Sequence, residues 1–220
     1  MKHGVYVREQ KTSVSTPVVA ESGVPFVVGT APVHSAESPA AIYTPVLCTD
    51  WEDAVKKLGY SDDWKVYTIC EVMYSHFKLF QRQPIIFCNV LDLSTCKEAV
   101  AGSEVTLSGR QAKLPFDAIL SSLVVKTASS SETALVKDTD YAAYYSDGNL
   151  IVETIEDGAA KAATKLYVTY DKVKTSDLDD DDIVKGIEAI DLCMATVSTT
   201  PDLIIAPGWS HTSTVQAVMA

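Results

Sequence analysis

The chain has 220 residues, enough for one large domain or two small ones, and 47% of them are hydrophobic, which is ample for a buried core. The 18 basic and 29 acidic residues give a formal net charge of −11, so the surface repels nucleic-acid phosphates and anionic membranes. No apolar run approaches the roughly 20 residues that span a bilayer, and MKHGVYV lacks the apolar stretch of a secretory signal. Composition therefore predicts a soluble, non-secreted protein that neither binds nucleic acid nor inserts into a membrane.

The first predicted element is a short strand in the stretch HGVYVREQ. Val5 and Val7 fall on one side of an extended chain and Tyr6 and Arg8 on the other, an alternation typical of a half-buried β-strand. No turn follows to fold the chain back, because residues 11–17 are the polar stretch KTSVSTP. A strand needs a partner for its backbone donors and acceptors, and the neighbouring sequence does not supply one.

An α/β pattern begins with a buried strand predicted at 24–32 and a helix predicted at 49–60. Thr49 and Glu52 have the spacing of a capping box, and Gly59 suits the left-handed position that ends a helix. Four apolar residues share one face of this helix: Trp51, Ala54, Val55 and Leu58.

Further helices and strands continue this pattern. A helix over about 64–81 is apolar around nearly all of its surface, so we expect burial on more than one side. A buried strand follows at 84–92, and after a different middle region come a helix at 176–197, a strand at 201–209 and a last helix from about 212. The helix at 176–197 carries apolar residues at helical spacing: Ile183, Ile187, Ile190 and Met194.

The middle region, 97–175, has short β-like runs with turn signals, and Asp147-Gly148 between apolar alternations predicts a hairpin. We therefore predict an α+β or α/β fold in which an α/β core is interrupted by a small antiparallel β domain, a sandwich or a barrel. The predicted parts are an extended N-terminal arm with its linker at 1–21, a discontinuous core at 22–96 and 176–220, and the inserted domain at 97–175.

Few side chains suggest chemistry. The five cysteines are widely spaced and mostly in apolar surroundings, which favours buried reduced thiols over a zinc site or disulfides. The run DLDDDD at 177–182 lacks the pattern of an EF-hand, so Asp179 to Asp182 are interpreted as complementing the N-terminus of the next helix.

Other candidates are equally weak. Ser210 and His211 follow a strand, where α/β enzymes place active sites, but they lack the GxSxG context, and a turn before the next helix is the favoured interpretation. His34 and His76 form no convincing dyad or ligand set. A group of tyrosines could stack on nucleic-acid bases, but cross-strand pairing explains it more simply: Tyr141, Tyr144 and Tyr145. No catalytic, cofactor-binding or metal-binding constellation is predicted.

Several stretches, in this order, resemble the tail sheath proteins of contractile phages and of related R-type bacteriocin-like particles. They are HGVYVREQ, SGVPFVVGTAPV (22–33), TPVLCTDWEDAVKKLGYSDDW (44–64), YTICEVMYSHFKLF (67–80), PIIFCNVLD (84–92) and TPDLIIAPGWS (200–210). The middle β region corresponds in kind to the inserted domain of that family.

The resemblance implies a structural, non-enzymatic subunit without cofactors, which polymerises around an inner tail tube and contracts to drive the tube through a cell envelope. Its expected partners are neighbouring sheath subunits, the tube protein and the baseplate. Its expected location is a phage tail or a bacteriocin-like particle assembled in the bacterial cytoplasm. The resemblance also implies an inter-subunit strand made by the N-terminal arm: Gly4, Val5, Tyr6, Val7, Arg8 and Glu9.

Sheath proteins continue past a PGWS-like turn into a C-terminal region that receives the arm strands, whereas this sequence ends at Ala220. The resemblance therefore leads us to expect a fragment or a partial sequence, with the acceptor sheet beyond residue 220. Two alternatives stay open at this stage: a carbohydrate- or surface-binding module acting through the β insertion, and a small α/β hydrolase using Ser210 and His211.

Overall fold

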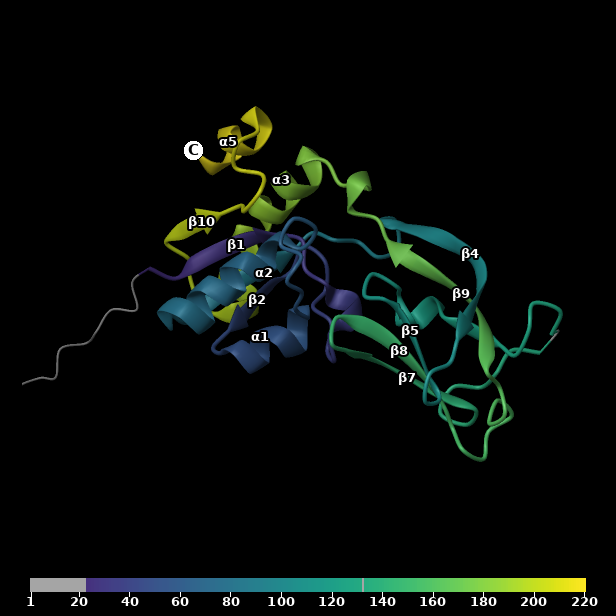
Figure 1. Cartoon of the computed structure of the whole chain (residues 1–220). Helices are drawn as coiled ribbons and strands as arrows, with labels where there is room; N and C mark the ends of the chain where they lie inside the picture. Colours follow the sequence, from purple (N-terminus) through teal and green to yellow (C-terminus); the bar gives the residue numbers. More distant parts are fainter. Residues whose placement is uncertain (1–22, 132) are drawn as a thin grey trace, which may run out of the picture.

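Three β-sheets organise the chain, and the computed structural model describes residues 23–131 and 133–220. One sheet has four strands in the order β10-β1-β3-β2, and the other two have three strands each, in the orders β4-β9-β6 and β5-β8-β7. Helices pack on the four-stranded sheet, and the six strands β4 to β9 lie to one side of it (Figure 1). The mixture of helices, a largely parallel sheet and antiparallel sheets is an α+β fold, as predicted.

The four-stranded sheet consists of β1 (Pro25–Gly29), β2 (Pro45–Cys48), β3 (Ile85–Asn89) and β10 (Leu203–Ile205). β1 runs parallel to both β3 and β10, while β2 is antiparallel to β3. The strands predicted at 24–32, 84–92 and 201–209 are thereby confirmed, although each is shorter than its predicted range. β2 was not predicted, because a four-residue strand shows too little periodicity to be recognised.

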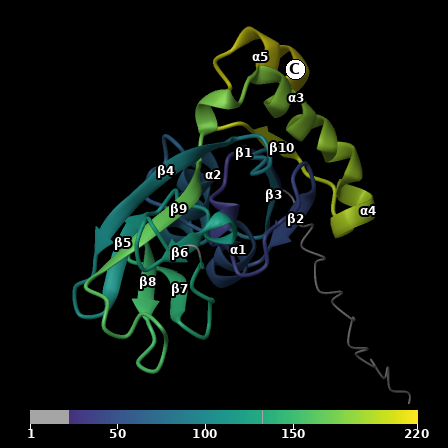
Figure 2. The same ribbon diagram turned by 90° about the vertical axis from the view of Figure 1, so that its right-hand side faces the viewer.

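Helices cover both faces of this sheet (Figures 1 and 2). Val27 and Phe87 belong to one core cluster, with α1 (Trp51–Leu58) and α2 (Thr68–Met73). The second helical layer consists of α3 (Asp180–Glu188), a 3₁₀ turn (Ala189–Leu192), α4 (Cys193–Val197) and α5 (Ser213–Met219). Phe26 belongs to the other core cluster, together with residues of α3 and α5. Since successive strand residues point to opposite faces, a continuous apolar run such as PFVV supplies both layers.

Helix α1 is confirmed, but its predicted cap is wrong by one residue. Asp50, not Thr49, is the N-cap, and its carboxylate accepts a 2.8 Å hydrogen bond from the Asp53 amide. Gly59 ends the helix with φ +72°, and a Cβ there would collide with the Pro32 carbonyl oxygen. Asp50 stands three residues before a free amide of the first turn, which is the geometry that an N-cap carboxylate needs.

The helix predicted at 64–81 forms only from Thr68, as α2 followed by a π-helix (Tyr74–Phe80). Burial on more than one side is confirmed within α2. The prediction fails at the end of the π-helix, where Leu79 and Phe80 are 59% and 69% exposed. Met194 is also exposed. The sequence predicts it on the same helix face as Ile183 and Ile187, but the 3₁₀ turn after α3 has fewer residues per turn and moves Met194 off that face.

The two antiparallel sheets comprise β4 (Lys97–Thr106), β5 (Gln111–Pro115), β6 (Val124–Lys126), β7 (Tyr141–Ser146), β8 (Asn149–Thr154) and β9 (Lys165–Val173). They share a core of their own that includes Leu150, Leu166 and Val168. Asp147 and Gly148 join β7 to β8 with φ of +48° and +67°, the two positive angles of a type I′ turn, so the predicted hairpin is confirmed. That 97–175 forms a separate inserted domain stays a prediction.

Candidate functional site

The predicted inter-subunit strand, Gly4 to Glu9, lies outside the described residues, but its point of attachment to the fold is described. The Gly23 amide donates a 2.7 Å hydrogen bond to the Asp202 carboxylate, and the Val24 amide donates a longer one, 3.3 Å, to the same oxygen. The Asp202 amide in turn donates to the Val24 carbonyl at 3.0 Å. The described part of the chain therefore begins, at Gly23, beside the first residue of β10.

β10 forms one edge of the four-stranded sheet (Figure 1). Its three residues pair with Pro25, Phe26 and Val27 of β1. Within the described part of the chain, no other strand or side chain hydrogen-bonds to Leu203, Ile204 or Ile205. The Leu203 side chain is 56% exposed. An edge strand of this kind presents backbone donors and acceptors that can pair with a further strand.

β2 forms the opposite edge and is covered. It begins with Pro45, which has no amide hydrogen to offer. The Lys57 ammonium group donates a 2.9 Å hydrogen bond to the Leu47 carbonyl and is held in place by Asp53 at 2.8 Å. Proline and lysine are two of the means by which proteins prevent edge strands from pairing. The two edges therefore differ in their capacity to accept a strand.

Exposed apolar side chains also occur on the helical layers. Leu79 and Phe80 end the π-helix on one face of the sheet, whereas Leu192, Met194 and Val218 lie on the other. Large apolar groups in water are unfavourable unless a partner covers them. Both helical layers thus offer contact surfaces besides the β10 edge.

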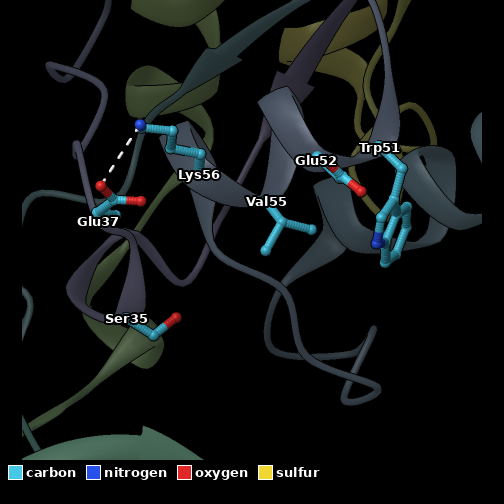
Figure 3. Close-up of a pocket in the computed structure, with 6 residues that line it drawn as sticks. All are labelled: Ser35, Glu37, Trp51, Glu52, Val55 and Lys56. Carbon is cyan, nitrogen blue, oxygen red and sulfur yellow. Dashed lines mark ion pairs between the residues drawn. The ribbon is translucent and has the colours of Figure 1, made fainter.

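A shallow depression of 320 Å³ lies between α1 and the segment around Ser35 and Glu37, which precedes β2 (Figure 3). The Trp51 ring packs against Tyr60, with ring centroids 4.7 Å apart, and the Lys78 ammonium group lies 4.5 Å from the Trp51 ring centroid. Glu37 and Lys56 form an exposed ion pair at 3.4 Å. The exposed ion pair of Glu37 and Lys56 contributes little to stability. The combination of apolar and ionic groups suits contact with a complementary protein surface.

Ser210 and His211, the candidate hydrolytic residues, occupy one turn of the described chain. Ser210 and His211 lie in the turn before α5, where the Ser210 carbonyl accepts a hydrogen bond from the Gln216 side chain at 3.0 Å. Among the described residues no hydrogen bond joins the side chains of Ser210 and His211. The His76 ring contacts the Val72 carbonyl of its own helix at 3.2 Å. The favoured interpretation of Ser210 and His211 as part of a turn is confirmed.

The acidic run caps a helix, as predicted. Asp179 is the N-cap of α3 and forms a reciprocal capping box with Asp182. Burial alone would raise the pKa of Asp182, yet hydrogen bonds from Tyr43, the Asp179 amide and Lys185 hold it below its ordinary value. Within residues 23–131 and 133–220, no three metal-binding side chains gather in one group.

The cysteines are all free and buried, which confirms that prediction. Burial raises the pKa of the Cys48, Cys70 and Cys88 thiols to about 12. Since the thiolate is the reactive form, these side chains have little reactivity near neutral pH.

The tyrosines of β7 do not form a stacking platform. Tyr141 and Tyr145 are directed to one face of the sheet and Tyr144 to the other, where its hydroxyl donates to Glu153 at 2.9 Å. The Tyr145 hydroxyl donates to the Ala118 carbonyl at 2.6 Å. Cross-strand pairing with β8, the simpler interpretation, is confirmed.

Comparison with known proteins adds no identification: no protein-family model matches the chain, and no curated protein is significantly similar to it. No helix of the described residues is both long enough and apolar enough to cross a bilayer. The described residues form an α+β protein whose largely parallel sheet has an open edge at β10.

Proposed function

We propose that this chain is a structural subunit of a contractile tail sheath, assembled by strand exchange between copies. One observation carries the proposal: β10 is an open edge in the described residues, and Gly23, the first described residue after the predicted arm and linker, is hydrogen-bonded to Asp202 beside that edge. The order of sequence stretches that resemble sheath proteins adds support. The proposal gives the protein no catalytic role and no cofactor.

In the proposed assembly, the strand at Gly4 to Glu9 of one copy pairs with the β10 edge of a neighbour. This proposal differs from the expectation drawn from the resemblance, which places the acceptor sheet beyond residue 220, because β10 is an edge that can accept a strand within the described residues. Val5 and Val7 face the neighbour's apolar layer, and the exposed Leu203 side chain becomes covered. Backbone pairing of this kind fixes the strand but not the orientation of the domain behind it. The polar linker at 11–17 can therefore bend while the strand stays in place.

A head-to-tail contact of this type generates rings or helical arrays, because each copy both donates and accepts a strand. Many weak contacts acting together hold such an array. The proposed partners are neighbouring copies, the inner tail tube and the baseplate, within a phage tail or bacteriocin-like particle assembled in the bacterial cytoplasm.

Residues 97–175 are proposed to be a domain inserted into the core. The two chain crossings lie side by side: Lys97 pairs with Val173, and the Lys174 amide donates to the Cys96 carbonyl at 3.0 Å. Adjacent ends are what an insertion requires, since the host chain can then close without it.

Deletion of residues 1–17 tests the arm. We expect the variant to fold with an unchanged circular dichroism spectrum and to form no tubes or rings in negative-stain electron micrographs. Val5→Ser/Val7→Ser should weaken assembly, whereas Val14→Ser in the linker should leave it intact. Normal tubes from the deletion variant would contradict the proposal.

A further inference from the structure

A pocket of 400 Å³ lies where the four-stranded sheet meets the antiparallel sheets. It is lined by segments far apart in the chain: the loop before α2, the end of β5, the β7–β8 turn and the end of β9. The residues that matter for its chemistry are Ser61, Asp63, Tyr67, Phe116, Asp117 and Thr175. Both the core and the proposed insertion therefore contribute to one pocket.

Two polar atoms of the pocket residues lack partners within the described chain. The Tyr67 side chain is only 2% exposed, and its hydroxyl has no hydrogen-bond partner. Oδ1 of Asp117 is also buried and unpartnered. Buried polar groups are normally satisfied, because leaving one unpaired costs free energy. Two such atoms in the lining of one pocket indicate a ligand that supplies hydrogen bonds.

The charges around the pocket are unbalanced. Its lining contains the carboxylates of Asp63 and Asp117 and no lysine, arginine or histidine. Lys172 is close enough to lower the pKa of Asp117, but its ammonium group pairs with Glu98 at 2.9 Å. Burial outweighs that effect, so the pKa of Asp117 lies above its ordinary value. A cation in the pocket would compensate the buried carboxylate.

Apolar groups complete the lining. Phe116 and Val66 line the pocket next to the polar groups. The Phe116 ring packs edge-on against Tyr67, with ring centroids 6.1 Å apart, and against Tyr145 at 5.7 Å. An aliphatic stem would bury its surface here, and a cation is also attracted to an aromatic face.

We propose that this junction pocket is a binding site for an ammonium or guanidinium group on a short alkyl stem. The cation pairs with Asp117 and Asp63 and donates to the Tyr67 hydroxyl, while the stem packs on Phe116. The shared chemistry has two sources: a free alkylamine, or a lysine or arginine side chain of a second copy. The site itself does not depend on the proposed sheath function.

Titration of the full chain with agmatine, which carries a guanidinium and an amine on a butyl stem, tests the site. We expect saturable chemical-shift changes in ¹H–¹⁵N NMR spectra, concentrated at the residues that line the pocket. Asp117→Asn should weaken binding at least tenfold, and Tyr67→Phe, which keeps the ring, should weaken it severalfold. The exposed Asp157→Asn is the matched control and should bind like the unmodified protein.

Three results would overturn the site: no saturable change at millimolar agmatine, equal binding by Asp117→Asn and Asp157→Asn, or shifts scattered over the acidic surface. Glutarate, an anionic compound of similar length, should produce no change. Because this titration uses the unassembled chain, its failure would leave the sheath proposal standing, and failed assembly would leave the site standing.

Assembled particles distinguish the two sources of the cation. If a basic side chain of a neighbouring copy fills the pocket, particles should no longer bind agmatine, and Asp117→Asn should impair assembly. If the natural ligand is a free amine, particles should bind agmatine as well as the unassembled chain does. Measurable agmatine binding that is equally strong in unmodified and in Asp117→Asn particles would contradict the site.

Discussion

The two edges of the four-stranded sheet differ. At one edge, β2 begins with Pro45, and its Leu47 carbonyl accepts a hydrogen bond from Lys57. At the other edge, β10 carries the exposed Leu203, and among the described residues no side chain hydrogen-bonds to its backbone. The central strands β1 and β3 are fully buried between helices. One sheet thus combines a protected edge with an edge that can still pair. Of the two edges of this sheet, β10 is therefore the better suited to accept a further strand.

The largest expected effect comes from the centre of the sheet that both edges share. Phe87 is fully buried in β3 and packs on Phe77, with ring centroids 6.3 Å apart. Phe87→Ala should lower the free energy of unfolding by about 3–5 kcal/mol, because it leaves a cavity. Leu203→Ala at the open edge should cost less than about 1 kcal/mol. Urea denaturation measures both values, and equal losses would show that Leu203 is not at an open edge.

Acidification tests a region between the four-stranded sheet and the antiparallel sheets, around His34. The His34 ring lies against Tyr67, Phe116 and Tyr145, and its Nε2–H donates to the Phe116 carbonyl at 2.9 Å. Burial lowers the pKa of His34 from 6.5 to about 4. Between these values the unfolded chain binds more protons than the folded one, so stability falls as the pH falls from about 6.5 to 4.

The expected contribution of His34 to this loss is about 2–3 kcal/mol. His34→Gln should reduce the slope of unfolding free energy against pH in that window, measured by urea denaturation at several pH values. The unmodified protein, measured at the same pH values, is the reference. An unchanged slope in His34→Gln would contradict the neutral, buried state of His34.

Asp202 tests the attachment of the N-terminal segment beside β10. Asp202→Ala removes the hydrogen bonds to the Gly23 and Val24 amides and should cost about 1 kcal/mol. Hydrogen exchange should become faster at Val24 and along β10 but not along β2. Asp157→Ala is the matched exposed control. Faster exchange at both edges would mean that Asp202 stabilises the whole sheet and not its β10 edge.

The smallest expected change in stability concerns the protected edge. Lys57→Met removes the hydrogen bond to the Leu47 carbonyl and should cost less than about 1 kcal/mol, yet it should increase self-association through β2. Sedimentation velocity at several concentrations measures this. Lys56→Met is the control, because among the described residues Lys56 forms an exposed ion pair with Glu37 and no hydrogen bond to β2. Similar association of both variants would show that Lys57 does not protect the edge.

Much of the fold follows from local sequence signals. The buried strands at 24–32 and 84–92, helix α1 with Gly59 at its end, and the Asp147-Gly148 hairpin all depend on residues that are close in the chain. Such signals survive folding because tertiary contacts reinforce them.

Other features depend on contacts that no local pattern contains. The 3₁₀ turn at Ala189–Leu192 rotates the helix and exposes Met194, and the end of the π-helix exposes Phe80. The strand β10 was predictable, but its place at the edge was not, because strand order is set by crossovers between distant segments. The junction pocket was missed for the same reason: Tyr67 and Asp117 are 50 positions apart in the sequence.

The most direct test of the central claim is a cross-link between the arm of one copy and the β10 edge of another. Chains carrying Val5→Cys or Val7→Cys are mixed with chains carrying Leu203→Cys, assembled, oxidised and separated without reductant. The native cysteines are buried, so background cross-linking should be low. We predict disulfide-linked dimers with Leu203→Cys and none with Val46→Cys on the β2 edge. Equal cross-linking at both edges, or none at either in assembled particles, would contradict the account.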